Sequence, residues 1–304
     1  MYVNPYDSVT LPIFAKAEFV EDLAMHYAWQ LEHLIALALQ EDLGSGDVAT
    51  EALIGASSAT AHWFAKAAGV VSGLEVARCV FRTLDPSLEM DVYIADGQRV
   101  AVGEEIVSFH GDFKALLMGE RTALNFAQRM SGIATSTRAF VDAIGDLPTR
   151  LLDTRKTVPG HRILDKQAVR DGGGTNHRMG LYDLAMIKDN HIAAAGGIRN
   201  AVRMVRKSIP AYLRIEVETS CLEEVREALE AKADIIMLDN MSLEAMRMAV
   251  QLIDGRALTE ASGNVTLGRI RAIAETGVDF VSTGAITHSV QALDISMKLE
   301  VRPQ

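Results

Sequence analysis

Residues 150–191 carry most of the side chains in this sequence that could bind and orient a small anion. The segment holds eight lysines and arginines against five aspartates, whereas the whole chain has a formal net charge of −10. It also contains His161, His177, His191 and a run of three glycines at 172–174. Positive side chains placed close together repel one another, and an anion bound among them relieves that repulsion. The composition of this segment therefore predicts an anion-binding site.

Six polar or charged side chains stand where short apolar runs end. In chain order these are Thr154, Lys188, Glu218, Asp239, Ser262 and Thr283. The last four are separated by 21, 23 and 21 residues, and patterns typical of helices lie between them. Strands and helices that alternate with this period indicate βα units around a parallel sheet. In an α/β barrel the carboxyl ends of such strands meet at one rim, so we expect these residues, Arg155 and Lys156 to converge there.

The residue types at this rim predict two kinds of binding. A guanidinium group pairs with a carboxylate through two hydrogen bonds, and a lysine adds a point charge. The candidates for binding carboxylates are Arg155, His177, Arg178 and Lys188. Glu218 and Asp239 could hold a hard divalent cation such as Mg²⁺, which is usually bound by one or two carboxylates and substrate oxygens. An alternative remains open, in which these two acids are only salt-bridge partners of lysines at the rim.

Two glycine-containing turns predict a phosphate site. ASGN at 261–264 and STGA at 282–285 each follow an apolar run and precede a helical pattern. Glycine allows backbone amides to approach a phosphate at the start of a helix. The last two strands of a barrel commonly carry this group. Either turn alone could equally be an ordinary connection between a strand and a helix.

The first half of the chain predicts a separate layer of helices and strands. Apolar residues recur every three or four positions at 19–39, and again over 114–144. Strand-like runs lie between these two helices, at 61–67, 90–94 and 99–109, together with a helix at 75–84. On the second long helix Arg121, Asn125, Gln128 and Arg129 could form a solvated face or an oligomer contact. We expect a first domain over 1–130 and a barrel domain over 131–287, with a helix over 288–304 that packs back on the first domain.

Composition excludes several classes of function. The isoelectric point near 5.3 and the lack of a long basic tract argue against a nucleic-acid partner. The two cysteines, Cys79 and Cys221, cannot form a cysteine-rich zinc site and fit a reducing compartment. No run of eighteen apolar residues occurs, so no membrane span is expected. These features predict a cytoplasmic protein.

Several longer motifs resemble those of the quinolinate phosphoribosyltransferases, also called nicotinate-nucleotide pyrophosphorylases (carboxylating). They are DTRKT at 153–157, GGGTNHRMGLYDLAMIKDNH at 172–191, RTALNFAQRMSGIAT at 121–135, and the shorter IEVET, MLDN and EASGN. EDLGSGDVAT at 41–50 resembles the family more weakly. The resemblance thus covers nearly all of the chain from Glu41 onward, and none of these motifs lies in the first forty residues.

The resemblance implies an enzyme of NAD biosynthesis. Such an enzyme joins quinolinate to phosphoribosyl pyrophosphate with Mg²⁺, and it releases nicotinate mononucleotide, pyrophosphate and CO₂. The implied fold is α/β, with an N-terminal α/β sandwich domain and an incomplete α/β barrel of six or seven strands related to the TIM barrel. It also implies a homodimer with shared active sites, which could assemble further.

The resemblance also assigns roles to individual residues. The implied quinolinate pocket consists of Thr154, Arg155, Lys156, His177, Arg178 and Lys188. Arg121 matches an arginine that reaches this pocket from a neighbouring subunit. The implied catalytic positions are Lys156, Lys188, Glu218 and Asp239, of which Glu218 and Asp239 are also the metal ligands. The implied 5′-phosphate loops contain Ser262, Gly263, Asn264, Thr283, Gly284 and Ala285, although some relatives have a second glycine in the ASGN loop.

Two other interpretations are compatible with the sequence. One is a phosphoribosyltransferase of the same fold with another acceptor, such as the relative associated with molybdate transport or an enzyme that uses nicotinate. The set Arg121, Arg155, Arg178 and Lys188 favours an acceptor with two carboxylates. The other is a catalytically silent barrel that serves as a binding or assembly module.

Overall fold

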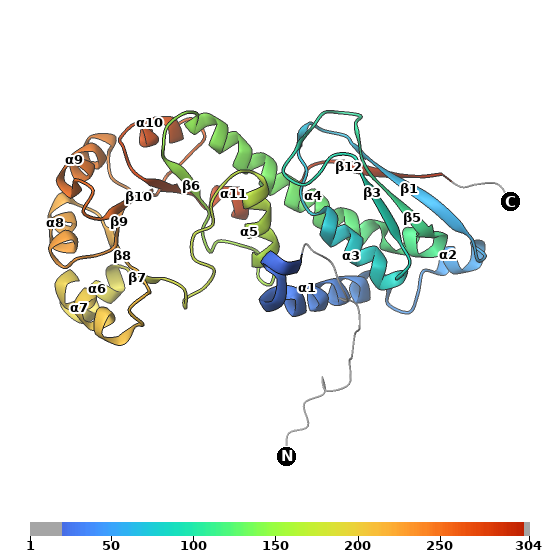
Figure 1. Ribbon diagram of the computed structural model, residues 1–304, viewed down its shortest axis with the longest axis horizontal. Helices are drawn as coiled ribbons and strands as arrows, with labels where there is room; N and C mark the ends of the chain where they lie inside the picture. Colours follow the sequence, from blue (N-terminus) through green and yellow to red (C-terminus); the bar gives the residue numbers. More distant parts are fainter. Residues whose placement is uncertain (1–19, 301–304) are drawn as a thin grey trace, which may run out of the picture.

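The computed structural model describes residues 20–300 and shows two parts joined by one long helix (Figure 1). The N-terminal part is a small antiparallel sheet covered by helices, and the C-terminal part is a parallel α/β barrel. Within the described residues, none of the helices has both the length and the apolar character needed to cross a membrane.

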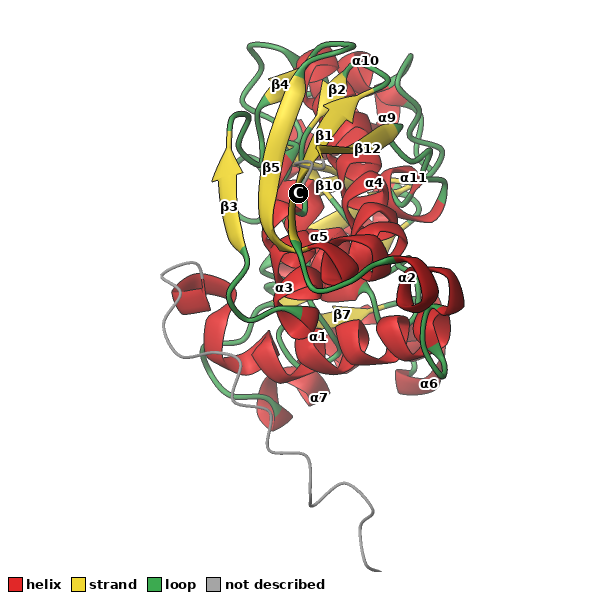
Figure 2. Cartoon of the chain, turned by 90° about the vertical axis from the view of Figure 1, so that its right-hand side faces the viewer, coloured by secondary structure: helices red, strands yellow, loops and turns green. Residues whose placement is uncertain are grey.

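The N-terminal part packs aromatic side chains between its sheet and its helices. Its elements are α1 (Val20–Leu43), α2 (Val48–Leu53), β1 (Ser58–Ala65), β2 (Gly69–Val70), α3 (Leu74–Leu84), β3 (Glu89–Val92), β4 (Arg99–Val100) and β5 (Glu105–Asp112). Every second residue of β1 is buried, as a strand with one covered face requires. Trp63 of β1 packs against Phe109 of β5, with ring centroids 5.2 Å apart, and Phe109 packs against Phe81 of α3 at 4.8 Å. Figure 2 shows the sheet in front of α4.

Helix α4 (Phe113–Ile144) connects the two parts without a break. Asp112 caps its start by accepting a 2.9 Å hydrogen bond from the amide of Ala115. The helix ends at Gly145, whose φ of +70° suits a residue without a Cβ. Because α4 packs on α3 at one end and on α5 and α10 at the other, it holds both parts in one arrangement.

Six parallel strands form the barrel, in the order β6-β11-β10-β9-β8-β7. The strands are β6 (Arg150–Leu152), β7 (Ala185–Ile187), β8 (Ile215–Thr219), β9 (Ile235–Asp239), β10 (Leu258–Ser262) and β11 (Phe280–Ser282). The helices are α5 (Arg162–Asp171), α6 (Asp189–Ala195), α7 (Ile198–Ser208), α8 (Leu222–Glu230), α9 (Leu243–Ile253), α10 (Ile270–Ala274) and α11 (Ala285–His288). Among the described strands β6 and β7 are the two edges, so the barrel is open between them, and the expected fold class is confirmed.

The helix expected over 288–304 is wrong for residues 289–300, and residues 301–304 lie outside the described part of the chain. The chain instead forms β12 (Ile295–Glu300), which pairs antiparallel with β1 from Ile295 opposite Ala65 to Glu300 opposite Thr60. The apolar residues Leu293, Ile295, Met297 and Leu299 alternate along the chain, which is the period of a strand and not of a helix. The end of the chain therefore completes the N-terminal sheet (Figure 1).

Gly132 of α4 allows the segment that leads into β12 to pass close to the helix. A Cβ at this position would lie 2.2 Å from the carbonyl oxygen of Gln291 and 3.0 Å from the Cα of Ala292. Both neighbours are backbone atoms, which cannot move aside as the end of a side chain can. The adjacent amide of Leu293 donates a 2.9 Å hydrogen bond to the carbonyl of Gln128, so this approach is part of the junction between α4 and β12.

We therefore predict that Gly132→Ala lowers the free energy of unfolding by about 1–3 kcal/mol, although alanine favours a helix. The urea unfolding midpoint measures the effect. Gly55→Ala is the control, because nothing lies within 4 Å of its added Cβ, and we expect a change of about 0.5 kcal/mol or less. Equal effects of the two substitutions would show that the close approach at Gly132 does not limit stability.

Candidate active site

The strand pairing places the six polar strand ends at one edge of the barrel. Ser262 of β10 is in register with Asp239 of β9, and Glu218 of β8 with Met237 of β9. Val217 of β8 pairs with Ile187, so Lys188 follows β7 beside Glu218. On the other side Ser282 pairs with Leu152, which brings Thr283 and Thr154 to the same edge. The residues that follow the strands thus form one continuous rim.

The buried carboxylate of Asp153 joins the end of β6 to the segment that carries His177 and Arg178. It accepts hydrogen bonds from the backbone amide of His177 at 2.8 Å and from Nδ2 of Asn176 at 2.7 Å. It also forms an ion pair with Lys166, whose side chain is almost completely buried and also donates to the carbonyl of His177 at 2.9 Å. Desolvation raises the pKa of Asp153 and lowers the pKa of Lys166, and their mutual attraction opposes both shifts. These contacts fix the 176–178 segment against β6.

Arg155 and Arg178 form a cation pair at the rim with few anionic partners. Desolvation lowers the pKa of Arg178, and the charge of Arg155 lowers it further, so the two guanidinium groups lie close enough to repel. Arg178 donates a 3.1 Å hydrogen bond to the carbonyl of Leu184. Nε of Arg155 is buried without a hydrogen-bond partner among the described residues. This pair therefore has unused donors and excess positive charge, as expected for a site that binds an anion.

Lys156 lies against the loop after β11. A Cβ at Gly284 would be 2.7 Å from Cδ of Lys156, and the hydroxyl of Thr287 donates to the carbonyl of Lys156 at 2.9 Å. Within the same loop the amide of Ala285 donates to Oγ1 of Thr283 at 3.3 Å. The loop predicted to bind phosphate therefore lies beside a lysine whose ammonium group has no ion-pair partner within residues 20–300.

The loop after β10 is built around a close approach to Asn240. Gly263 has a φ of +86°, and a Cβ there would lie 2.2 Å from Oδ1 of Asn240. Nδ2 of Asn264 donates to the same oxygen at 2.9 Å. Helix α10 begins only at Ile270, so the amides of this loop do not form a helix N-terminus as the sequence pattern had indicated. Any contact of this loop with a phosphate would depend on the loop amides themselves.

Glu218 and Asp239 have different surroundings. Glu218 accepts a 2.8 Å hydrogen bond from Nζ of Lys188, so the salt bridge considered as an alternative for this residue is present. Asp239 accepts from Nδ2 of Asn240 at 2.7 Å, and it has no ion pair with any described residue. Each carboxylate keeps one oxygen free of these contacts. Glu218 and Asp239 stand near the ends of the neighbouring strands β8 and β9, and carboxylate oxygens are the ligands that a hard cation such as Mg²⁺ prefers.

His177 does not lie on the open rim but points into the barrel, between Glu216 and Glu260. Its Nε2 is 3.3 Å from an oxygen of each acid. Desolvation lowers the pKa of His177, but the two acids raise it more strongly, to about 10. Desolvation raises the pKa of Glu216 to about 7. The backbone amide of Arg178, however, donates to Nδ1 of His177 at 2.7 Å, which a doubly protonated ring could not accept. Two N–H groups cannot point at each other at that distance, so Nδ1 of His177 carries a lone pair.

Neither acid was among the residues predicted from the sequence. In the run IEVET, Glu216 and Glu218 are two positions apart and so share one face of β8, which was the signal available for Glu216. Glu260 is the acid of EASGN and lies two positions before Ser262 on β10. Residues two positions apart on a strand face the same side. Glu216 therefore lies below Glu218, and Glu260 lies below Ser262, inside the barrel.

The polar residues of α4 fall into two groups, those that bind other elements of the chain and one that is exposed. Gln128 donates to the carbonyl of Ile295 at 2.7 Å, and Arg129 forms two hydrogen bonds with Asp165, at 3.0 and 2.8 Å. These two residues therefore join α4 to β12 and α5. Arg121 is exposed and makes no hydrogen bond or ion pair with any described residue. Arg121 stands near the start of α4, next to Thr122, which lines a cavity between α4 and α1 of the N-terminal part.

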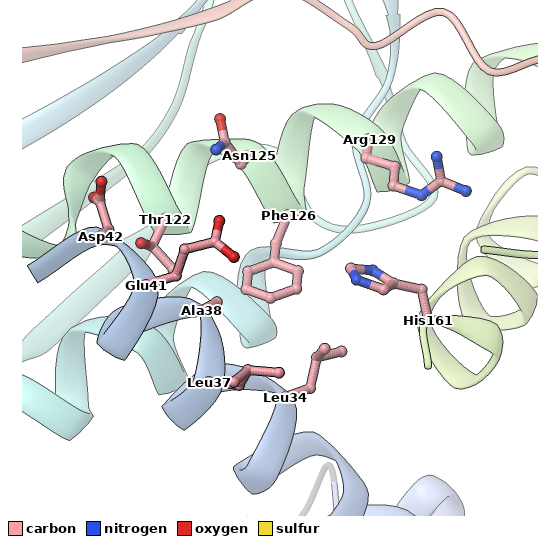
Figure 3. A pocket seen from close by; sticks show the side chains of 10 residues that line it. All are labelled: Leu34, Leu37, Ala38, Glu41, Asp42, Thr122, Asn125, Phe126, Arg129 and His161. Carbon is pink, nitrogen blue, oxygen red and sulfur yellow. The ribbon is translucent and has the colours of Figure 1, made fainter. Parts of the chain in front are cut away.

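A cavity of about 360 Å³ lies between α1 and α4 (Figure 3). Its lining residues are Leu34, Leu37, Ala38, Glu41, Asp42, Thr122, Asn125, Phe126, Arg129 and His161. The ring of His161 stacks on Phe126, with centroids 5.8 Å apart, and burial lowers the pKa of this histidine. No residue predicted to bind substrate, phosphate or metal lines this cavity.

Fold and rim together define an α/β-barrel protein built to bind a small, multiply charged anion at the carboxyl ends of its strands. Family models described as the N-terminal and C-terminal domains of quinolinate phosphoribosyl transferase match residues 47–131 and 133–298. The chain belongs to the quinolinate phosphoribosyltransferase family.

Several named proteins are similar to this chain over most of its length. A probable nicotinate-nucleotide pyrophosphorylase (carboxylating) of Synechocystis sp. is 50% identical over 264 residues, which cover 86% of this chain and 90% of that protein. A quinolinate phosphoribosyltransferase (decarboxylating) of Nicotiana glauca is 44% identical and covers 98% of this chain and 93% of its own length. The crystal structure of NadC from Streptococcus pyogenes has a TM-score of 0.87 at 43% identity, covering 90% of this chain and 97% of that one.

The buried pair of Asp153 and Lys166 leads to a stability prediction. Removing one partner of a buried ion pair leaves an uncompensated charge, so Lys166→Met should lower the free energy of unfolding by about 3–5 kcal/mol. The control is Arg199→Met, because Arg199 and Glu230 form a 2.8 Å ion pair with both side chains about two-thirds exposed. We expect about 0.5 kcal/mol or less there. Chemical denaturation of both variants measures the difference, and similar values for the two would contradict the central role assigned to Asp153.

Proposed function

We propose that this protein transfers the phosphoribosyl group of phosphoribosyl pyrophosphate to quinolinate, with loss of CO₂, in the de novo synthesis of NAD. The products are nicotinate mononucleotide and pyrophosphate. The observation that best supports this activity is the Arg155 and Arg178 pair, which has excess positive charge and a buried donor without a partner among the described residues. Family membership over residues 47–131 and 133–298 supports the same activity.

The first step is a displacement at C1 of the ribose. The lone pair of the pyridine nitrogen forms the new bond to C1, and the electrons of the breaking C1–O bond leave with pyrophosphate. Glycosyl transfer of this kind develops positive charge at the ring, so alignment of nitrogen, C1 and leaving oxygen lowers the barrier. Arg155, Arg178 and Lys188 would hold the two carboxylates of quinolinate and thereby aim its nitrogen. Lys156, beside the Gly284 loop, would place a positive charge near the phosphates.

The second step needs no dedicated base. Alkylation converts the ring nitrogen into a pyridinium, and loss of the neighbouring carboxylate as CO₂ leaves its electron pair on the adjacent carbon. The positive nitrogen stabilises that pair until a proton from solvent is added. The protein therefore acts through position and electrostatics, by groups that keep their protons throughout.

We propose Mg²⁺ as the cofactor, held by Glu218 and Asp239 together with substrate oxygens. When bound, it would neutralise charge on the departing pyrophosphate. The contact of Glu218 with Lys188 links this position to the carboxylate-binding residues. The free cysteines, Cys79 and Cys221, are compatible with a reducing compartment, and we place the protein in the cytoplasm.

We further propose a homodimer with shared sites, which could assemble into a higher oligomer. Arg121 is exposed and without a partner among the described residues, although an arginine on a long helix has five donors to satisfy. Large apolar side chains are exposed nearby on α1 and α2, among them Leu37 at 63% and Leu53 at 79%. A second copy that covers this face would receive Arg121 at its barrel rim and complete the pocket for a dicarboxylate.

The proposed activity predicts equal amounts of pyrophosphate and CO₂ when the protein is mixed with quinolinate, phosphoribosyl pyrophosphate and Mg²⁺. Arg178→Ala should raise the KM for quinolinate by about 10- to 100-fold, the loss expected for a charged hydrogen bond. The KM for phosphoribosyl pyrophosphate should change little. Arg203→Ala, on the exposed side of α7, is the control. Pyrophosphate without CO₂, or turnover with nicotinate, would indicate another acceptor, and no release of either product would indicate a silent barrel.

The shared site predicts complementation between two inactive variants. Arg121→Ala and Lys188→Ala should each reduce turnover strongly. In a heterodimer of the two, one site combines an intact Arg121 with an intact Lys188, and the other site lacks both. Random mixing should therefore restore about a quarter of wild-type activity. Heterodimers that form, as native mass spectrometry can show, but remain inactive would mean that Arg121 does not act across the interface.

A further inference from the structure

Three titratable side chains meet inside the barrel, below the cations of the rim. Nε2 of His177 lies 3.3 Å from Oε2 of Glu216 and 3.3 Å from Oε2 of Glu260. Glu216 belongs to β8 and Glu260 to β10, the two neighbours of β9. The two acids are 0% and 1% exposed. Both oxygens of Glu216 and one of Glu260 have no hydrogen-bond partner among the described residues.

The contacts of the histidine ring determine where its proton lies. Nδ1 accepts a 2.7 Å hydrogen bond from the amide of Arg178, so Nδ1 presents a lone pair. The ring proton is therefore on Nε2, where it faces the two carboxylates. These three residues have the composition of a metal site, with one atom from each within 4.8 Å of the others. A histidine binds a metal through a lone pair, however, and the nitrogen that faces the acids carries the proton.

The ring and the backbone of His177 are held by different parts of the barrel. The backbone amide of His177 is bound to Asp153 at the end of β6, whereas its ring reaches the acids of β8 and β10. Residues 176–178 lie outside any helix or strand and follow three glycines. These two attachments fix the start of the Arg178 side chain, and the hydrogen bond from its guanidinium group to the carbonyl of Leu184 holds the other end. Because the amide of Arg178 donates to the His177 ring, the position of that ring also restrains the backbone of Arg178.

The two acids are unusual for a role in packing alone. Burial of a carboxylate without hydrogen bonds is costly, and an apolar residue would fill the same space at lower cost. The two acids place a carboxylate oxygen 3.3 Å from this one N–H group on either side. They also place negative charge beneath Arg178, which Glu216 attracts.

We propose that Glu216 and Glu260 are positioning residues that hold His177 in its Nε2-protonated form, and that this ring aims Arg178 at a carboxylate of quinolinate. This inference rests on the function proposed above. Because either acid can receive the N–H when the other is absent, the two acids should act redundantly. The double variant should therefore lose much more than the two single variants together.

The experiment compares single and double variants in the full-length protein. Glu216→Leu and Glu260→Leu should each raise the KM for quinolinate less than threefold, whereas the double leucine variant should raise it at least tenfold. The KM for phosphoribosyl pyrophosphate should stay within threefold in all of them. The double glutamine variant should recover most of the quinolinate affinity, because an amide oxygen still accepts the N–H. Equal losses for both substrates, or additive losses in the double variant, would overturn the proposal.

A second measurement needs no substrate. In protein labelled with ¹⁵N-histidine, the His177 signals, identified by their absence in His177→Asn, should show a protonated Nε2 and an unprotonated Nδ1. The double leucine variant should show a mixture of the two forms. A proton on Nδ1 in the wild type, or a stoichiometric metal ion that is lost with the two acids, would overturn the assignment. Failure of the wild type to turn over quinolinate would refute the proposed function, while the ¹⁵N signals would still decide the position of the proton.

Discussion

The candidate site depends on one buried carboxylate that ties an irregular segment to the barrel. Asp153 stands at the end of β6 and accepts hydrogen bonds from Asn176, from the amide of His177 and from the buried Lys166. A charge in this position is tolerated only because several donors surround it. These contacts hold residues 176–178, which belong to no helix or strand, against the end of β6. Arg155, two residues beyond Asp153, and Arg178, one residue beyond His177, are thereby held near each other.

Two guanidinium groups held together need negative charge nearby, and acids in and around the barrel interior supply it. Like charges held close together repel, so a cationic site needs opposite charge nearby. Asp183 and Glu216 both attract Arg178, and Glu218 pairs with Lys188. The acidic interior below the basic rim thus stabilises the site until an anionic substrate arrives. This layering explains how a basic segment can belong to an acidic protein.

Those features of the fold that depend on local periodicity could be predicted from the sequence. The regular spacing of Glu218, Asp239, Ser262 and Thr283 led to parallel strands, and their pairing places all four at one edge. The strand at the end of the chain was missed because its alternating residues were interpreted as a helix, and its pairing partner β1 lies some 230 positions earlier. The interior acids were missed because, although Glu216 shares the period-two face of Glu218, nothing in the sequence connects either acid with His177. Only the fold brings Glu216 and Glu260 to the same histidine.

The sequence also could not predict which polar residues of α4 make contacts within the chain. Arg121, Gln128 and Arg129 have similar spacing and chemistry, and no property of the helix alone distinguishes them. Gln128 meets β12 and Arg129 meets Asp165 because both lie where α4 crosses from one part of the molecule to the other. Their contacts hold α4 against the strand that closes the N-terminal sheet and against the first helix of the barrel. Arg121, about two turns earlier, lies beyond this junction, on a helix that the junction makes rigid. A side chain on such a support keeps a fixed position relative to its own barrel, which is what precise delivery into the barrel of a second copy would require.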